Sequence, residues 1–217
     1  MENRILDLYP GLPQPKEHPQ HEYNQSYSIT TLILLFFTFS VIGWVWEVAL
    51  FMLNEGTFVN RGTMFGPWLP IYGTGGLLAL VLLRKFFKNP ILTFFAMMVI
   101  SGLIEYFTSY YLEVTRGVKW WDYSGYFLNL DGRICLEGLI VFGLGGCACI
   151  YYVAPLLNNI FEKISQKLRI PLCVILVALF IFDSVYSHFY PNMGKGITDF
   201  PETSYFRYNT MVKKMRL

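Results

Sequence analysis

Five apolar segments fill most of the chain between residues 28 and 190. They cover residues 28–53, 68–83, 91–112, 134–157 and 170–190, and the second is short and rich in glycine. A helix needs about 20 mostly apolar residues to cross a bilayer, and backbone groups in lipid must be paired within the segment. The sequence therefore predicts an all-α, polytopic membrane bundle with about five transmembrane helices.

The composition of the chain also indicates a membrane location. Apolar residues make up 54% of it and charged residues 15%, whereas a soluble domain carries about 25% charged residues. These fractions exclude a disordered chain, a coiled coil and an ordinary water-soluble enzyme. The net charge of +2 gives little attraction to phosphate, so nucleic-acid binding is disfavoured. The expected partner is the lipid bilayer.

Three regions follow from the polarity of the sequence. Residues 1–27 form a polar, proline-rich N-terminal tail, residues 28–190 the transmembrane helical domain, and residues 191–217 a polar and basic C-terminal tail. The N-terminal tail carries His18, His21 and Glu22 where a secretory signal needs an apolar core. We therefore predict no cleaved export signal.

Two short basic loops determine the predicted orientation. Residues 84–88 and 162–169 lie on one side in an alternating topology and hold six Lys or Arg, against four in the two opposite loops. The positive-inside rule places the basic side in the cytoplasm. This predicts a multi-pass cell-membrane protein with a cytoplasmic N-terminus and, for five spans, an external C-terminus. A missed or re-entrant segment would reverse the C-terminal side.

Five carboxylates lie within or at the edge of the apolar segments. They are Glu47, Glu105, Glu113, Glu137 and Asp183, and alternating topology places all five away from the basic loops. A charge in hydrocarbon is unfavourable, so each is expected to face protein or water. One interpretation is an outward-facing acidic pocket with loop arginines at its mouth. The alternative, that each Glu pairs with an Arg to fix helix packing, is compatible with the first.

The loops on the carboxylate side add further candidate residues. Trp121, Asp122 and Tyr123 suit a substrate rim or, alternatively, an interfacial aromatic belt. Arg133 and Glu137 are four residues apart, a spacing that permits a direct ion pair. The candidate substrate-binding residues are Glu47, Asn60, Arg61, Glu105, Glu113, Trp121, Asp122, Tyr123, Asn129, Arg133, Glu137 and Asp183. We predict no catalytic, cofactor-binding or metal-binding residue, and we interpret the four cysteines as buried thiols because their spacing is not that of a zinc site.

A weak internal repeat relates two parts of the chain. The segments 28–53 and 91–112 each lead, through a loop containing Asn and Arg, to a glycine-rich helix. The glycines are Gly73, Gly75 and Gly76 in one helix and Gly143, Gly145 and Gly146 in the other. The pattern predicts two helical hairpins in parallel orientation plus one further helix. In transporters built from parallel repeats, the binding site lies at the repeat interface.

Several short motifs occur in one order along residues 32–157. They are Gly43-Trp44-Val45-Trp46-Glu47, Phe58-Val59-Asn60-Arg61-Gly62, Gly66-Pro67, Pro70-Ile71-Tyr72-Gly73, Glu105-Tyr106, Trp120-Trp121-Asp122-Tyr123-Ser124, and Asn129 with Gly132-Arg133-Ile134-Cys135-Leu136-Glu137. As a set they resemble the bacterial membrane family of ABC-transporter type IV permeases, also labelled CmpB-like. The resemblance implies a multi-pass membrane protein.

An ABC permease would need a separate ATPase subunit, for which residues 158–169 are the better docking candidate. Five spans make a poor pore, so a homodimer or a partner permease is expected.

Three functions are compatible with these features. The leading hypothesis is a transporter component whose acidic pocket binds a cationic or zwitterionic solute through Glu47, Glu105 and Glu137. A membrane enzyme acting on lipid or cell-envelope precursors is the second, because paired carboxylates can act as acid and base and arginines can hold phosphate. The third is a non-catalytic scaffold or sensor. An enzyme is less favoured than a transporter.

Overall fold

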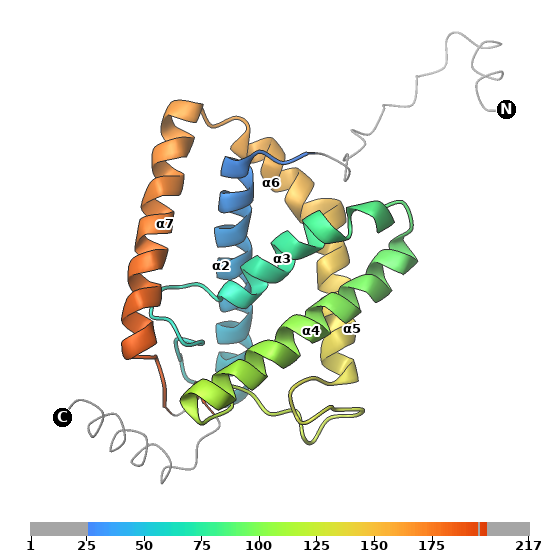
Figure 1. Ribbon diagram of the computed structural model, residues 1–217, viewed down its shortest axis with the longest axis vertical. Coiled ribbons are helices and arrows are strands. Elements are labelled where there is room, and N and C mark those ends of the chain that lie inside the picture. The colour runs from blue at the N-terminus through green and yellow to red at the C-terminus, as the bar shows by residue number, and fades with distance from the viewer. Residues whose placement is uncertain (1–25, 195, 199–217) are drawn as a thin grey trace, which may run out of the picture.

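The computed structural model describes residues 26–194 and 196–198, and within them the fold is a bundle of helices (Figure 1). The helices are α2 (Ile29–Glu55), α3 (Pro70–Leu82), α4 (Pro90–Arg116), α5 (Leu136–Ala148), α6 (Ala154–Phe161) and α7 (Gln166–Phe189). A 3-10 turn, η1 (Arg84–Phe86), precedes α4, and a π-helical turn, η2 (Cys149–Val153), joins α5 to α6. The all-α membrane bundle expected from the sequence is confirmed.

Four helical stretches are long and apolar enough to cross a membrane. They are α2, α4, α7 and the continuous rod Leu136–Phe161 that α5, η2 and α6 form together. The segment expected over residues 68–83 differs, because only its 13-residue helix α3 is helical. At 1.5 Å per residue this helix covers roughly 20 Å, less than the hydrocarbon core of about 30 Å. The described residues thus hold four spanning helices and one short apolar helix.

The chain between α2 and α3, residues 56–69, folds back into the bundle, and we call it the re-entrant segment. The backbone N–H of Leu69 donates to the backbone oxygen of Ser40 at 3.0 Å. Ser40 lies well inside the 27-residue helix α2, so α3 begins near the middle of the bundle and not at its edge. Non-helical backbone at membrane depth is tolerated only where protein or a water-filled cavity surrounds it. The re-entrant segment explains how so short a helix completes a return across the bundle.

The two long helices α2 and α4 begin and end with the same capping chemistry. The side chains of Ser28 and Asn89 accept hydrogen bonds from the first turns of α2 and α4, respectively. Gly56 and Gly117 end them with φ angles of 70° and 74°, the left-handed conformation that glycine adopts without steric penalty. The local sequence therefore determines both ends of each helix.

Helix directions place chemically different loops at the two ends of the bundle. In Figure 1, α2, α4 and α7 descend, whereas α3 and the rod of α5 and α6 ascend. The basic turns after α3 and α6 therefore lie at the upper end, and the 117–135 loop lies at the lower end. We call these the basic end and the carboxylate end. The five intramembrane carboxylates are all on the half of their helices nearer the carboxylate end.

The two helical hairpins, α2 with α3 and α4 with α5, pack through equivalent glycines. A Cβ atom added to either of two glycines in α3 would collide with α2, and two glycines of α5 are equally close to α4. Gly73 faces Phe36 and Ser40 as Gly143 faces Phe94 and Met98, and Gly76 faces Phe39 as Gly146 faces Met97. A shift of 58 residues relates the first helices of the two hairpins and a shift of 70 relates the second helices. The repeat expected from the glycine pattern is therefore also a repeat of contacts.

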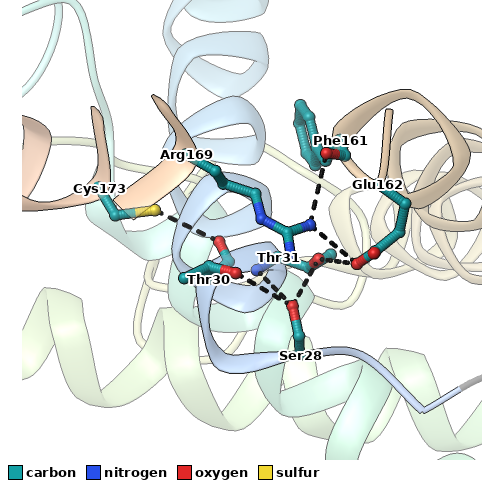
Figure 2. Close-up of polar contacts among 7 residues, drawn as sticks. All are labelled: Ser28, Thr30, Thr31, Phe161, Glu162, Arg169 and Cys173. Carbon is teal, nitrogen blue, oxygen red and sulfur yellow. Dashed lines mark hydrogen bonds and ion pairs between the residues drawn. The ribbon is translucent and has the colours of Figure 1, made fainter. Parts of the chain in front are cut away.

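At the basic end, an ion pair between a buried arginine and a half-exposed glutamate joins three helices (Figure 2). Arg169 of α7, only 2% exposed, places Nη1 2.9 Å from Oε1 of Glu162 and donates to the backbone oxygen of Phe161 at 3.4 Å. The hydroxyl of Thr31 on α2 donates to the same Glu162 oxygen at 3.2 Å. The Cys173 thiol donates to the backbone oxygen of Thr30 at 3.6 Å. These contacts hold the start of α7 against the start of α2 and the end of α6.

Candidate functional site

Glu105 of α4 is the most enclosed of the predicted site residues that carry a charge. Its exposed fraction is 4%, and it lies on the inward stripe of α4 together with buried Ser101, Gly102 and Ser109. Its Oε1 accepts a hydrogen bond of 3.0 Å from the phenol of Tyr123. Its Oε2 is buried and has no hydrogen-bond partner among the described residues. One carboxylate oxygen is thus shielded from solvent without a donor.

Glu47 of α2 occupies a more open and better-paired position. Oε1 accepts a hydrogen bond of 2.7 Å from the phenol of Tyr72, and Oε2 lies 3.7 Å from Nε of Arg61. Arg61 also donates to the backbone oxygen of Gly196 and lies over the ring of Phe51, 5.2 Å from its centroid. Arg61 is therefore fixed as the counter-ion of Glu47.

Tyr123 brings these two carboxylates into one cluster. Burial first, and then the neighbouring Glu105 and Glu47 charges, raise the pKa of the Tyr123 phenol, so it remains a hydrogen-bond donor. The ring of Tyr72 packs on that of Phe142 across the two hairpins, with centroids 5.9 Å apart. We call these five residues, Glu47, Tyr72, Glu105, Tyr123 and Phe142, the Glu47–Glu105 cluster.

Arg133 forms a different ion pair from the one its sequence spacing permitted. Its Nη2 lies 2.6 Å from Oε2 of Glu113, and its Nη1 donates to Ser109 at 3.3 Å. Glu137 instead accepts a backbone hydrogen bond from Phe127 at 3.2 Å. The expected pair of Arg133 with Glu137 is wrong, because α5 begins only at Leu136 and Arg133 lies in the preceding loop, where helical i, i+4 geometry does not apply.

Three predicted residues build the 117–135 loop itself. Asp122 accepts hydrogen bonds from the hydroxyl and the backbone N–H of Ser124, and these two bonds, the hydroxyl first, lower the pKa of the Asp122 carboxyl. Asn129 accepts from the backbone N–H of Gly132 at 3.2 Å, and Trp121 donates its indole N–H to the backbone oxygen of Arg133 at 2.9 Å. The loop that carries Tyr123 to Glu105 is thus ordered by its own polar side chains.

The remaining two predicted residues, Asp183 and Asn60, form hydrogen bonds with the re-entrant segment. Asp183 accepts hydrogen bonds from the backbone N–H groups of Phe65 and Gly66, at 3.1 and 2.8 Å, and from the indole of Trp68 at 2.9 Å. Asn60 accepts from the indole of Trp44 at 2.6 Å and donates to the backbone oxygen of Phe65 at 2.8 Å. These side chains satisfy polar groups that would otherwise be unpaired at membrane depth.

Two members of the cluster, Tyr72 and Phe142, were missed in the sequence. An aromatic residue in an apolar helix carries no polar signal of its own. The repeat could have found both, since each stands immediately before the first of the paired glycines, Gly73 and Gly143. Their contact shows that equivalent positions of the two hairpins meet.

No metal centre is found among the described residues. No group of three or more His, Cys, Asp or Glu in this part of the chain could hold a metal ion. A cavity between α2, α3 and α7 is lined by apolar residues only. Its lining includes Ile33, Phe36, Leu77 and Phe180, and none of the five carboxylates. The polar residues of the carboxylate end, the Glu47–Glu105 cluster among them, therefore lie outside this cavity.

Comparison with known proteins identifies the family. A family model described as Putative ABC-transporter type IV matches residues 34–188, well over half of the chain. Comparison with curated proteins found no match, nor did comparison with solved structures. The match extends beyond the motifs of residues 32–157 and includes α7 and Asp183. This helical membrane protein therefore belongs to the family that the model describes as Putative ABC-transporter type IV.

Proposed function

We propose that the chain is the membrane-spanning permease component of a transporter and that a positively charged solute binds at the Glu47–Glu105 cluster. The observation that carries the proposal is Glu105, a buried carboxylate with one oxygen that no described residue pairs. Intramembrane acids commonly mark a substrate or ion pathway. The cluster also joins two parallel hairpins, the position at which repeat-built transporters bind their substrates.

The distribution of basic residues supports an outward-facing cluster. Arg84, Lys85, Lys88, Lys163 and Lys167 belong to the basic end, whereas the buried Arg169 is paired there with Glu162. Under the positive-inside rule this end is cytoplasmic. The N-terminus is then cytoplasmic, the re-entrant segment and α3 together return the chain, and the end of α7 is external.

A separate subunit would supply the energy for transport. The sequence has no Gly-x4-Gly-Lys-[Ser/Thr] phosphate loop, so an ATPase partner is required for ATP-driven transport. The turn between α6 and α7 is the part of the cytoplasmic end that could receive it, since Ile160 and Leu168 are 46% and 64% exposed there. Because four spanning helices make a poor pore, a second copy or a partner permease completes the pathway.

Complementation of a deletion strain tests the transport function. Cells would carry wild-type protein, Glu105→Gln or Glu55→Gln, the last removing an exposed carboxylate where α2 ends at the carboxylate end. Accumulation of a panel of radiolabelled amines, amino acids and sugars is measured in each strain at equal membrane abundance. We expect wild type and Glu55→Gln to transport equally and Glu105→Gln to be at least about tenfold slower, from losing a charged hydrogen-bonding group. Equal rates for Glu105→Gln, or no solute that depends on the gene, would overturn the proposal.

A further inference from the structure

The contact register of the two hairpins makes Glu47 and Glu105 equivalent residues. The shift of 58 that relates the glycine contacts of α2 to those of α4 converts position 47 into position 105. The shift of 70 that relates α3 to α5 converts Tyr72 into Phe142. Tyr72 and Phe142 pack against each other. The Glu47–Glu105 cluster is therefore a pair of equivalent half-sites that meet between the hairpins.

The two half-sites differ in how each carboxylate is compensated. Glu47 accepts a hydrogen bond from the Tyr72 hydroxyl and forms an ion pair with Arg61. Phe142 has no hydroxyl to offer Glu105, and none of the ion pairs found in the described residues involves Glu105. Its one described donor is Tyr123, on Oε1. Within this part of the chain, the Glu105 half-site thus has one negative charge and one acceptor in excess.

Resting on the proposed transport function, we propose that Glu105 binds the ammonium group of a protonated amine, one per chain. An ammonium supplies both things that Oε2 lacks, a positive charge and N–H donors. A proton would remove the charge but would not supply Oε2 with an N–H donor. A divalent metal needs several oxygen ligands, and the carboxylate of Glu47 is already engaged by Tyr72 and Arg61.

The walls of the half-site also suit a cation. Tyr72, Tyr123 and Phe142 present aromatic rings, whose faces attract cations. All three side chains are half-buried, whereas Glu105 is 4% exposed. The buried carboxylate is thus bonded to one of these more exposed aromatic side chains, Tyr123. A ligand with a small cationic head and an apolar body matches a buried carboxylate that has aromatic side chains beside it.

Binding to the purified chain in nanodiscs of phosphatidylcholine tests the proposal without requiring transport. The probes are n-butylammonium and its quaternary analogue butyltrimethylammonium, which has the same charge but no N–H donor. We expect saturable calorimetric binding of butylammonium to wild type and to Glu55→Gln. Binding to Glu105→Gln and binding of the quaternary probe to wild type are both expected to be at least about tenfold weaker. Equal binding of both probes, undiminished binding to Glu105→Gln, or no binding to wild type would overturn the proposal.

A second variant, Phe142→Tyr, keeps the carboxylate and the fold. It gives the Glu105 half-site the hydroxyl that Tyr72 provides to Glu47. We expect Phe142→Tyr to unfold at the wild-type temperature or above it and to bind butylammonium at least about threefold more weakly, because the new hydroxyl competes for Oε2. If the folded Phe142→Tyr protein bound butylammonium as tightly as wild type, Oε2 of Glu105 would not be the atom that binds the ammonium group.

The two proposals fail in different ways. If the complemented cells transport a neutral or anionic solute and the purified chain does not bind butylammonium, the amine site and the positive charge of the solute are wrong, and only the role as a transporter component stands. If the purified chain binds butylammonium through Glu105 and the gene changes the accumulation of no solute, the site stands and the transport function is wrong.

Discussion

Asp183 of α7 accepts a hydrogen bond of 2.8 Å from the backbone N–H of Gly66, in the non-helical segment that re-enters the bundle. The same carboxylate also takes donors from Phe65, Trp68 and Ser187. One acidic side chain therefore satisfies backbone and indole groups of a different part of the chain. The acceptor capacity of Asp183, a predicted substrate-binding residue, is therefore taken by structural hydrogen bonds.

Asp183→Ala is expected to destabilise the protein strongly. It removes the acceptor of three donors on the re-entrant segment, and each buried donor left unpaired costs about 1–3 kcal/mol. Thermal unfolding in detergent should show a large drop in midpoint for Asp183→Ala and a small one for Ser187→Ala, which removes a single donor. A midpoint for Asp183→Ala within error of wild type would show that the segment does not depend on this residue.

Arg169→Met tests the ion pair of Figure 2, in which the arginine is buried. Removing one partner of a buried pair leaves an uncompensated charge and costs about 3–5 kcal/mol. Because Glu162 is half-exposed, at 49% of its side chain, the effect should fall at or below the lower end of that range. The double variant Arg169→Met with Glu162→Gln should recover part of the loss in a double-mutant cycle. Additive losses would mean that the two side chains do not interact energetically.

Tyr72→Phe should lower stability and leave the fold intact. The change removes the 2.7 Å hydrogen bond to Glu47 and retains the ring contact with Phe142. A hydrogen bond to a charged group contributes roughly 1.5–3 kcal/mol. The matched control is Tyr152→Phe, at a residue that is 68% exposed. Chemical unfolding of both variants should show a loss for Tyr72→Phe alone, and equal stabilities would contradict the role given to the hydroxyl.

The glycine contacts predict a position-specific response to alanine. A Cβ at Gly73 would approach the backbone oxygen of Phe36 to 2.6 Å, whereas at Gly75 its nearest neighbour is a side-chain atom of Ile104 at 3.9 Å. Overpacking of this kind costs about 1–3 kcal/mol. Gly73→Ala should therefore unfold at a lower temperature than Gly75→Ala. Within the second hairpin, Gly143→Ala and Gly145→Ala should repeat the same contrast if the hairpins are equivalent.

Tyr123 predicts a loss of stability at alkaline pH. Its pKa is raised above the ordinary value of 10.0 by burial and by Glu105. The folded protein therefore favours the neutral phenol, and this contribution is fully present below pH 10 and declines as the pH rises towards the folded-state pKa. The difference in unfolding free energy between wild type and Tyr123→Phe should shrink above about pH 10. If the difference in unfolding free energy grew with pH, the pKa of Tyr123 would not be raised in the folded protein.

Much of the architecture could be predicted from the sequence. The apolar segments predict α2, α4, α5 with α6, and α7, because each stretch of apolar residues must pair its own backbone in lipid. Alternation along the chain places the five acids toward one end, and the glycine spacing predicts the paired hairpins. These features depend on neighbouring residues of the same helix, so a linear pattern contains them.

Only the tertiary structure decided which polar groups meet. It pairs Arg133 with Glu113, gives Asp183 to the re-entrant segment, and leaves Oε2 of Glu105 without a described donor. The shortness of α3 has the same origin, since Asp183 and Ser40 accept the backbone donors that allow residues 56–69 to remain non-helical inside the bundle. The composition and spacing of the sequence predict how many charged residues lie in the membrane. Which of them is neutralised depends on contacts between residues far apart in the chain, and those exist only once the helices are packed.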